Sequence, residues 1–196
     1  MEPLTSQDYP NLHHHGSYLA AARWKNGPTG LTVLVSVHAS PNPADPEAYD
    51  WEGDLPAPRY GGDPRYTSNQ LWDSDLVLQT LRDLSDDGCV SLVAAGDFNE
   101  AMADDIEPGT QARLGTWGQE YYTRVKEAGS SDWLYDAWRE ERPTREALQL
   151  DRVLVSRPAE FLLAASREPH VGAAWARTSA DQLSDHAPVW FALRTD

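Results

Sequence analysis

The chain has 196 residues, of which 31 are acidic and 16 basic, so its formal net charge is −15 and its sequence pI is about 4.6. A hydrophobic share of 40% with eight tryptophans is too high for a disordered chain. The acidity disfavours non-specific binding to nucleic acids or anionic membranes, which depends on lysine and arginine. The length suits one domain, so we expect a single domain over residues 1–196.

The predicted elements begin with two strands, Tyr18–Trp24 and Leu31–Val37. The second is an almost continuous apolar run, which is typical of a strand buried on both faces, and it leads directly into His38. Residues 41–66 follow, with six prolines and no helical or strand period. Loops of this length are usually functional or disordered. The aromatic residues favour an ordered segment that either walls a substrate cleft or is only pinned to the surface.

A helix and a third strand come next. Thr67-Ser68-Asn69-Gln70 is a capping-box pattern, leucines follow it at helical spacing as far as Leu84, and Asp86-Asp87-Gly88 is a stop signal. The strand Val90–Ala95 then ends in Gly96-Asp97-Phe98-Asn99. Cys89, directly before this strand, is the single cysteine of the chain, so the chain cannot form an internal disulfide. We expect Cys89 to be buried as a small hydrophobic residue.

The second half of the chain has weaker patterns. Helices are predicted near Gln119–Glu127 and Asp132–Glu140, and strands at Asp151–Ser156 and Val189–Leu193. Strands interleaved with helices are typical of sheets covered by helices, so the fold class is α/β or α+β with a layered core. No window reaches the ~20 apolar residues of a membrane helix, and no secretory signal is recognisable at the start. We therefore expect a cytoplasmic protein without membrane insertion.

Polar side chains adjoin four of the predicted strands. They are, in chain order, His38, Asp97, Asn99, Asp151, Asp185 and His186. Strand ends hold polar side chains rigidly and expose them to solvent. Each residue alone has an ordinary explanation, since Asp and Asn favour turns. That explanation gives no reason for all six to adjoin buried strands, so we expect them to form one site.

These motifs resemble the endonuclease/exonuclease/phosphatase superfamily of metal-dependent phosphodiesterases and phosphatases. The resemblance runs from about Leu19 to Leu193 and depends on four segments in this order: Val37-His38, Gly96-Asp97-Phe98-Asn99, Leu150–Val155 and Ser184–Val189. It implies a DNase-I-like fold, a two-layer β-sandwich of mixed sheets flanked by helices, here shortened at the N-terminus. It also implies a divalent-metal-dependent hydrolase of phosphate esters.

The resemblance implies a role for each of the six residues. His186 would act as the base that takes a proton from the attacking water, and Asp151 would orient its imidazole. Asp185 would bind Mg²⁺ or Mn²⁺, for which a hard carboxylate oxygen is suited. Asp97 would hold the water or a second metal ion. The donors to the phosphoryl oxygens would be His38 and Asn99.

The chain departs from the family pattern before His38. Family members carry an Asn at the end of the first core strand and, further on, a metal-binding Glu, both upstream of the first His; the residues before His38 contain no strand followed by Asn and no apolar strand that ends in Gln-Glu. Substitute ligands could be Glu100, Glu2 or Asp8, although a solvated surface charge is the simpler interpretation of each. Three explanations stay open, in this order: a longer gene that continues upstream of Met1, a shortened enzyme with fewer ligands, or an inactive relative that acts as a binding domain.

The remaining predictions concern partners and alternatives. A strand edge left open by the shortening would be covered by a partner chain or by self-association. The substrate is expected to be a phosphate ester, with nucleic acid among the candidates, and the acidity mildly favours a smaller phosphorylated molecule. A Ser-His-Asp hydrolase fits less well, because the G-x-S-x-G setting is absent around Ser184 and Ser36. Solvated histidines are expected at 13–15, and surface ion pairing at Arg139, Arg142, Arg145 and Arg152.

Overall fold

The computed structural model describes residues 1–15, 19–27, 30–39, 43–44, 51–54, 71–86, 90–99, 133–137, 151–159, 162, 171–173, 189–191 and 193. The elements of this part, in chain order, are β1 (Glu2–Pro3), the 3-10 helix η1 (Pro10–His15), β2 (Leu19–Gly27), β3 (Gly30–His38), β4 (Pro43–Ala44), β5 (Leu71–Trp72), α2 (Asp73–Leu84), β6 (Ser91–Asp97), β7 (Leu134–Asp136), β8 (Asp151–Ser156), the 3-10 helix η3 (Arg157–Ala159), β9 (Val171–Ala173) and β10 (Val189–Phe191).

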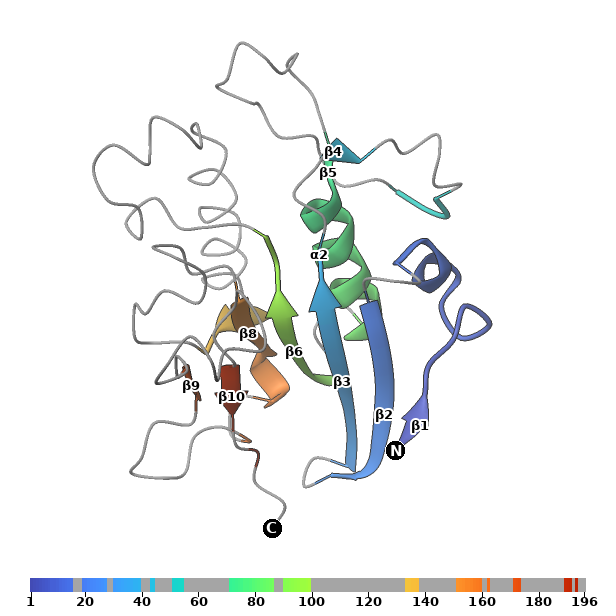
Figure 1. Ribbon diagram of the computed structural model, residues 1–196. Coiled ribbons are helices and arrows are strands. Elements are labelled where there is room, and N and C mark those ends of the chain that lie inside the picture. Colours follow the sequence, from blue (N-terminus) through green and yellow to red (C-terminus); the bar gives the residue numbers. More distant parts are fainter. Residues whose placement is uncertain are drawn as a thin grey trace, which may run out of the picture.

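Six strands form the main sheet, in the order β1-β2-β3-β6-β8-β7 (Figure 1). Strands β3 and β6 are parallel, and every other neighbouring pair of this sheet is antiparallel. The other described strands form two two-stranded sheets, β4-β5 and β9-β10. Parallel strands need a crossover connection, and the chain between β3 and β6 includes α2. The mixed sheet and its covering helix confirm the predicted α/β class.

One face of the main sheet packs against α2. Along β3, Val33, Val35 and Val37 are at most 5% exposed, as the two-residue period of a strand requires for one buried face. They share a core with Val77 and Leu81 of α2, which are one helical turn apart. Within the described ranges, no helix combines the length and the apolar character needed to cross a membrane.

The opposite face of the sheet has a core of its own over β6 and β8. Its buried members are Val93, Val153, Val155, Ala159 and Leu162. Leu193, two residues after β10, packs against this cluster, and β10 lies against β8 (Figure 1). Strands β6 and β8 are therefore buried on both faces, which agrees with the layered core that the sequence predicted.

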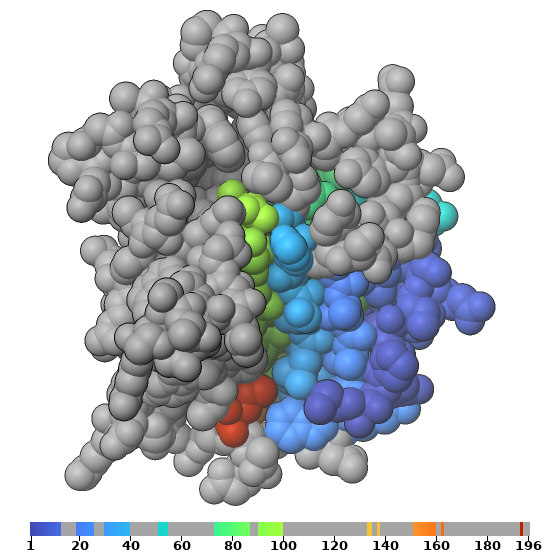
Figure 2. All heavy atoms as spheres, in the orientation of Figure 1, coloured from blue at the N-terminus to red at the C-terminus, as the bar shows by residue number. Residues whose placement is uncertain are grey.

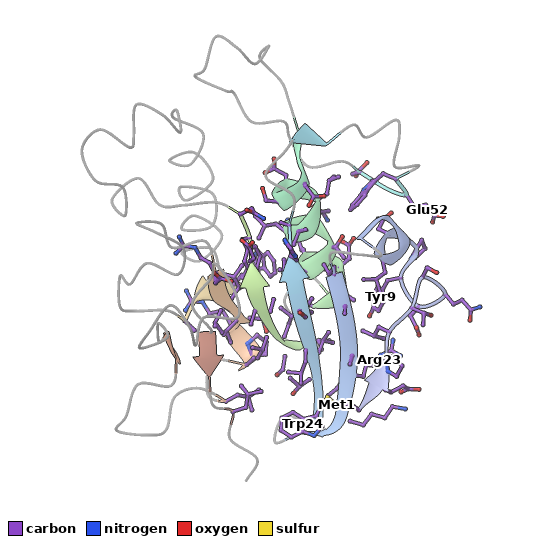
Figure 3. The ribbon with its side chains drawn as sticks, in the orientation of Figure 1. Met1, Tyr9, Arg23, Trp24 and Glu52 are labelled. Atoms are coloured by element: carbon purple, nitrogen blue, oxygen red, sulfur yellow. The ribbon has the colours of Figure 1, made fainter. Side chains whose placement is uncertain are left out.

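The N-terminal segment runs along β2. Strand β1 pairs with β2 so that Glu2 lies opposite Arg23, and η1 follows it. Asn11 of η1 is 7% exposed and bonds both main-chain groups of Glu52: its Nδ2 donates to the carbonyl oxygen at 2.9 Å, and its Oδ1 accepts from the N–H at 3.0 Å. Figure 3 shows Glu52 on the η1 side of the molecule. Residues 51–54 of the long segment 41–66 are thus tied to the N-terminal segment.

The observed helix begins later than predicted. It starts at Asp73, not near Thr67, because Leu71 and Trp72 pair as β5 with Ala44 and Pro43. Acidic residues in its first turn then favour the helix N-terminus. After the helix, the left-handed conformation expected at a stop is taken by Asp86, with φ of 49°. Gly88 and Cys89 lie outside the described residues.

The prediction of a helix at Asp132–Glu140 is wrong for its central part. Residues Leu134–Asp136 form β7, which pairs with β8 from Leu134 opposite Ser156 to Asp136 opposite Leu154. Leu134 is fully buried in the core. Pairing and burial at the sheet therefore outweigh the local helical pattern, as tertiary contacts commonly do. The helix expected near Gln119–Glu127 lies outside the described residues.

Candidate active site at one end of the main sheet

Three of the predicted site residues lie in one row across three adjacent strands. His38, the last residue of β3, is the register partner of Asp97, the last residue of β6. Asp97 is in turn the register partner of Asp151, the first residue of the antiparallel strand β8. Neighbouring strands are about 4.8 Å apart, so each of these side chains starts within reach of the next one in the row. We call His38, Asp97 and Asp151 the site row.

The site row lies on the sheet face opposite α2. Side chains two residues apart share a face of a strand, and Asp151 therefore shares its face with Val153 and Asp97 shares its face with Val93, both members of the second core. On β3 the same face carries Ser36 and His38, which are exposed. Figure 2 shows this face, where β3 and β6 are visible side by side at the surface. On this face, the site row therefore lies next to the apolar side chains of the second core.

His38 and Asp97 are in ion-pair distance. Nε2 of His38 lies 3.8 Å from Oδ2 of Asp97, with the His38 side chain 68% exposed and the Asp97 side chain 13% exposed. The imidazole is therefore accessible to a ligand, while the carboxylate beside it is mostly buried. This arrangement suits the two to hold or move a proton at the molecular surface.

Gly96 lets β3 and β6 approach closely beside the site row. Its φ of 141° belongs to a conformation that residues with a side chain rarely adopt. A Cβ at this position would collide with the carbonyl oxygen of Val37 and stand 2.9 Å from its carbonyl carbon. The glycine of the Gly-Asp-Phe-Asn motif is therefore required by the packing of the two strand ends.

Asn99 is bonded to both strand ends. Its main-chain N–H donates to Oδ1 of Asp97 at 2.7 Å, and its side-chain Nδ2 donates to the carbonyl oxygen of Ala39 at 2.6 Å. The N–H of Ala39 donates to the carbonyl oxygen of Asp97 at 2.8 Å. Asn99 has a φ of 54°, the left-handed region that Asn tolerates better than most residues. Ala39, which follows His38, was not singled out from the sequence, since nothing but its position marks it.

The prediction that Arg152 lies at the surface is wrong. The sequence pattern indicated a surface ion pair, but the residue is 3% exposed. It lies on β8 opposite Gly96, on the face that also buries Leu154 against α2. Alternation along the strand, which sets Asp151 on the site face, necessarily turns the next side chain into the core.

The last two predicted site residues, Asp185 and His186, lie outside the described residues, as do Glu100, Arg139, Arg142 and Arg145. Glu2 is at the far edge of the sheet, where its carboxylate contacts Lys25 at 2.6 Å. Asp8 contacts Arg23 at 3.3 Å on the same edge. Neither of these two is near the site row in sheet order. In the part of the chain that the structure describes, no three His, Cys, Asp or Glu side chains form a group that could hold a metal ion.

The chain matches no family model and no curated protein. Solved structures to which it is similar include the cytolethal distending toxin of Haemophilus ducreyi, at 17% identity, and the catalytic domain of human Nocturnin with a bound sulfate anion, at 18% identity. Both similarities have a TM-score of 0.43 and cover 89% of this chain. The chain spans about half the length of each, 52% and 53% respectively.

Proposed function

We propose that the chain is a divalent-metal-dependent hydrolase of phosphate esters, of the nuclease, phosphodiesterase or phosphatase type. The observation that carries the proposal is the site row, in which one imidazole and two carboxylates end three adjacent strands. Hydrolysis of a phosphate ester needs an activated water and donors at the oxygens where negative charge develops. An imidazole and carboxylates fixed on neighbouring strands are groups of this kind.

In this proposal each residue has a task. His38, exposed at the end of β3, donates to a phosphoryl oxygen when its ring is protonated. Asp97 orients the attacking water, and Asp151 orients the imidazole of His186, which takes the proton from that water. The assignments to Asp151 and His186 rest on the order of the motifs in the sequence.

A hard divalent cation would need ligands beyond the site row, because no three of the described His, Cys, Asp or Glu side chains form a group that could hold a metal ion. Mg²⁺ is commonly held by one or two carboxylates together with substrate oxygens, and Asp97 supplies one carboxylate at the end of β6. We assign the binding of Mg²⁺ or Mn²⁺ to Asp97 and, on the order of the motifs in the sequence alone, to Asp185. When bound, the ion supplies positive charge that balances the charge growing on the phosphoryl oxygens.

The test is hydrolysis of bis-nitrophenyl phosphate by the purified chain with Mg²⁺ or Mn²⁺. EDTA should abolish the activity and excess metal should restore it. His186→Ala and Asp97→Ala should each lower kcat by about 100-fold or more, the usual contribution of a positioned acid or base.

The matched control is Asp83→Asn. Asp83 is an exposed carboxylate in the last turn of α2, before the start of β6, whereas Asp97 ends β6. Its loss should leave kcat unchanged. A folded, monodisperse sample that shows no hydrolysis at any metal concentration would contradict the proposal and favour the alternative of a binding domain.

A further inference from the structure

His38 lies between two fixed points of the main chain. On one side, the carbonyl group of Val37 is in close approach to Gly96 of the neighbouring strand. On the other side, Ala39 is bonded at both of its main-chain groups, its N–H to the carbonyl of Asp97 and its carbonyl to the side chain of Asn99. The position of the His38 backbone therefore depends on these two contacts.

The bond from Asn99 to Ala39 has a defined direction. A carbonyl oxygen only accepts, so the nitrogen of the Asn99 side chain must face it. The bond joins residues 60 positions apart in the sequence and is partly buried. Because the main-chain N–H of Asn99 simultaneously donates to the Asp97 carboxylate, this one residue links the strand end of His38 to the side chain that His38 contacts.

We infer that Asn99 is a positioning residue, whose side-chain amide fixes the end of β3 and thereby holds His38 beside Asp97. The inference rests on the proposed function for its catalytic meaning, but its structural content is independent of it. It assigns to Asn99 a task other than the donation to a phosphoryl oxygen that the sequence resemblance implied. One N–H of the Asn99 side chain donates to the main-chain carbonyl of Ala39.

The experiment compares Asn99→Gly and Asn99→Asp with the wild type. Glycine keeps the left-handed conformation and removes the amide. Aspartate keeps the shape and tolerates the same φ, but its carboxylate has no N–H to donate. Asn11→Gly is the matched control, since Asn11 also bonds the main chain of a distant segment, at Glu52.

The readouts are amide hydrogen exchange and the NMR signals of the His38 ring. In both Asn99 variants the Ala39 N–H should exchange at least tenfold faster and the His38 ring signals should shift. The amides of Leu81 and Leu84 in α2 should exchange as before. In the control, exchange should accelerate at Glu52 and stay unchanged at Ala39.

Activity separates this role from direct substrate contact. If Asn99 positions His38, kcat on bis-nitrophenyl phosphate falls in both variants while KM is unchanged, together with the exchange effect at Ala39. A fall in kcat with unaltered Ala39 exchange and His38 signals would overturn the inference, as would unaltered exchange without any effect on kcat. If the wild type has no activity, the proposed function fails, and exchange at Ala39 still decides whether Asn99 holds the strand end.

Discussion

The site row and the N-terminal edge of the main sheet differ in the contacts that hold most of their polar side chains. At the N-terminal edge, formed by β1, β2 and η1, ion pairs join exposed side chains, Arg23 to Asp8 at 3.3 Å and Lys25 to Glu2 at 2.6 Å. Figure 3 shows Arg23 and Tyr9 on this edge, and a hydrogen bond with Tyr9 raises the pKa of Arg23 above its ordinary value, with a further contribution from Asp8.

Around the site row, by contrast, the contacts run to the main chain. Asn99 bonds the carbonyl of Ala39, and Gly96 packs against the carbonyl of Val37. Exposed ion pairs contribute about 0–1 kcal/mol and tolerate small shifts of either partner, whereas main-chain contacts fix the strands themselves. Substitutions of similar size should therefore be costly at the centre of the sheet and mild at its edge.

The largest expected effect is that of Gly96→Ala. The added Cβ meets the Val37 carbonyl and the backbone is held in a strained conformation, so we expect a loss of about 3 kcal/mol or more in the free energy of unfolding. Urea denaturation measures it. Gly30→Ala is the control, because Gly30 also has a positive φ, 86°, but nothing lies within 4 Å of the added Cβ. It should cost about 1 kcal/mol, and equal losses in the two variants would remove the distinction.

Ser156→Ala should have the next largest effect. The Ser156 hydroxyl accepts from the N–H of Leu92 at 2.8 Å and donates to the carbonyl of Val90 at 3.0 Å, at a fully buried position. Its removal leaves both main-chain groups without this partner, which should cost about 2 kcal/mol in the free energy of unfolding. The exposed Ser36 provides the control, since Ser36→Ala should stay within about 0.5 kcal/mol of the wild type. A neutral Ser156→Ala would contradict the importance of contacts at the sheet centre.

At the N-terminal edge, Asn11→Ala should have a moderate effect. Two hydrogen bonds to Glu52 are lost, and because the site is only partly buried, water can replace them in part. We expect a loss of about 1 kcal/mol in the free energy of unfolding and faster exchange of the Glu52 amide. A loss as large as that of Gly96→Ala would show that the edge is as constrained as the centre.

The smallest effect is expected from the charges of the edge. Lys25 lowers the pKa of Glu2 below its ordinary 4.5, and the N–H of Thr5 lowers the pKa of Asp8 below its ordinary 3.8. Carboxylates with lowered pKa values stabilise the fold above those ordinary values, and the stabilisation disappears as the pH falls through the lowered pKa. The double variant Glu2→Gln/Asp8→Asn should thus be slightly less stable than the wild type at pH 7, and the difference should be smaller at pH 2.

Urea midpoints of both proteins at the two pH values provide the measurement. Because both carboxyl groups are exposed, the difference at pH 7 should be small. A difference that grows on acidification would contradict the assigned direction of the two pKa values.

The sequence predicts the strands of the main sheet well where the apolar run is continuous, although β3, which was predicted to be buried on both faces, has a second face that is half-buried at Leu34 and exposed at Ser36. Leu31–Val37 and Val90–Ala95 were expected and are found as β3 and β6, each within one or two residues. The prediction fails at Leu134–Asp136 and at Leu71–Trp72, because short strands owe their conformation to a partner elsewhere in the chain. Local pattern contains no information about that partner.

For the site, strand ends were a sufficient guide to His38, Asp97 and Asp151 as neighbours. The sequence did not reveal the role of Ala39, because its contact with Asn99 is made by a main-chain carbonyl, which every residue type has. It also did not reveal the burial of Arg152, which follows from the position of its neighbour Asp151 on the opposite face of β8. Asp185 and His186 lie outside the described residues, so their roles in the site stay predictions.

Because β3 and β6 pair in parallel, we expect the site row to form late in folding. Its three residues belong to strands that are joined by long connections, so their approach requires closure of large loops before any of the ladder contacts can compensate for the lost chain entropy. The hairpin of β2 and β3, in contrast, closes locally. A chain interrupted during synthesis before Asp151 can already contain the hairpin, but it cannot yet contain the complete row.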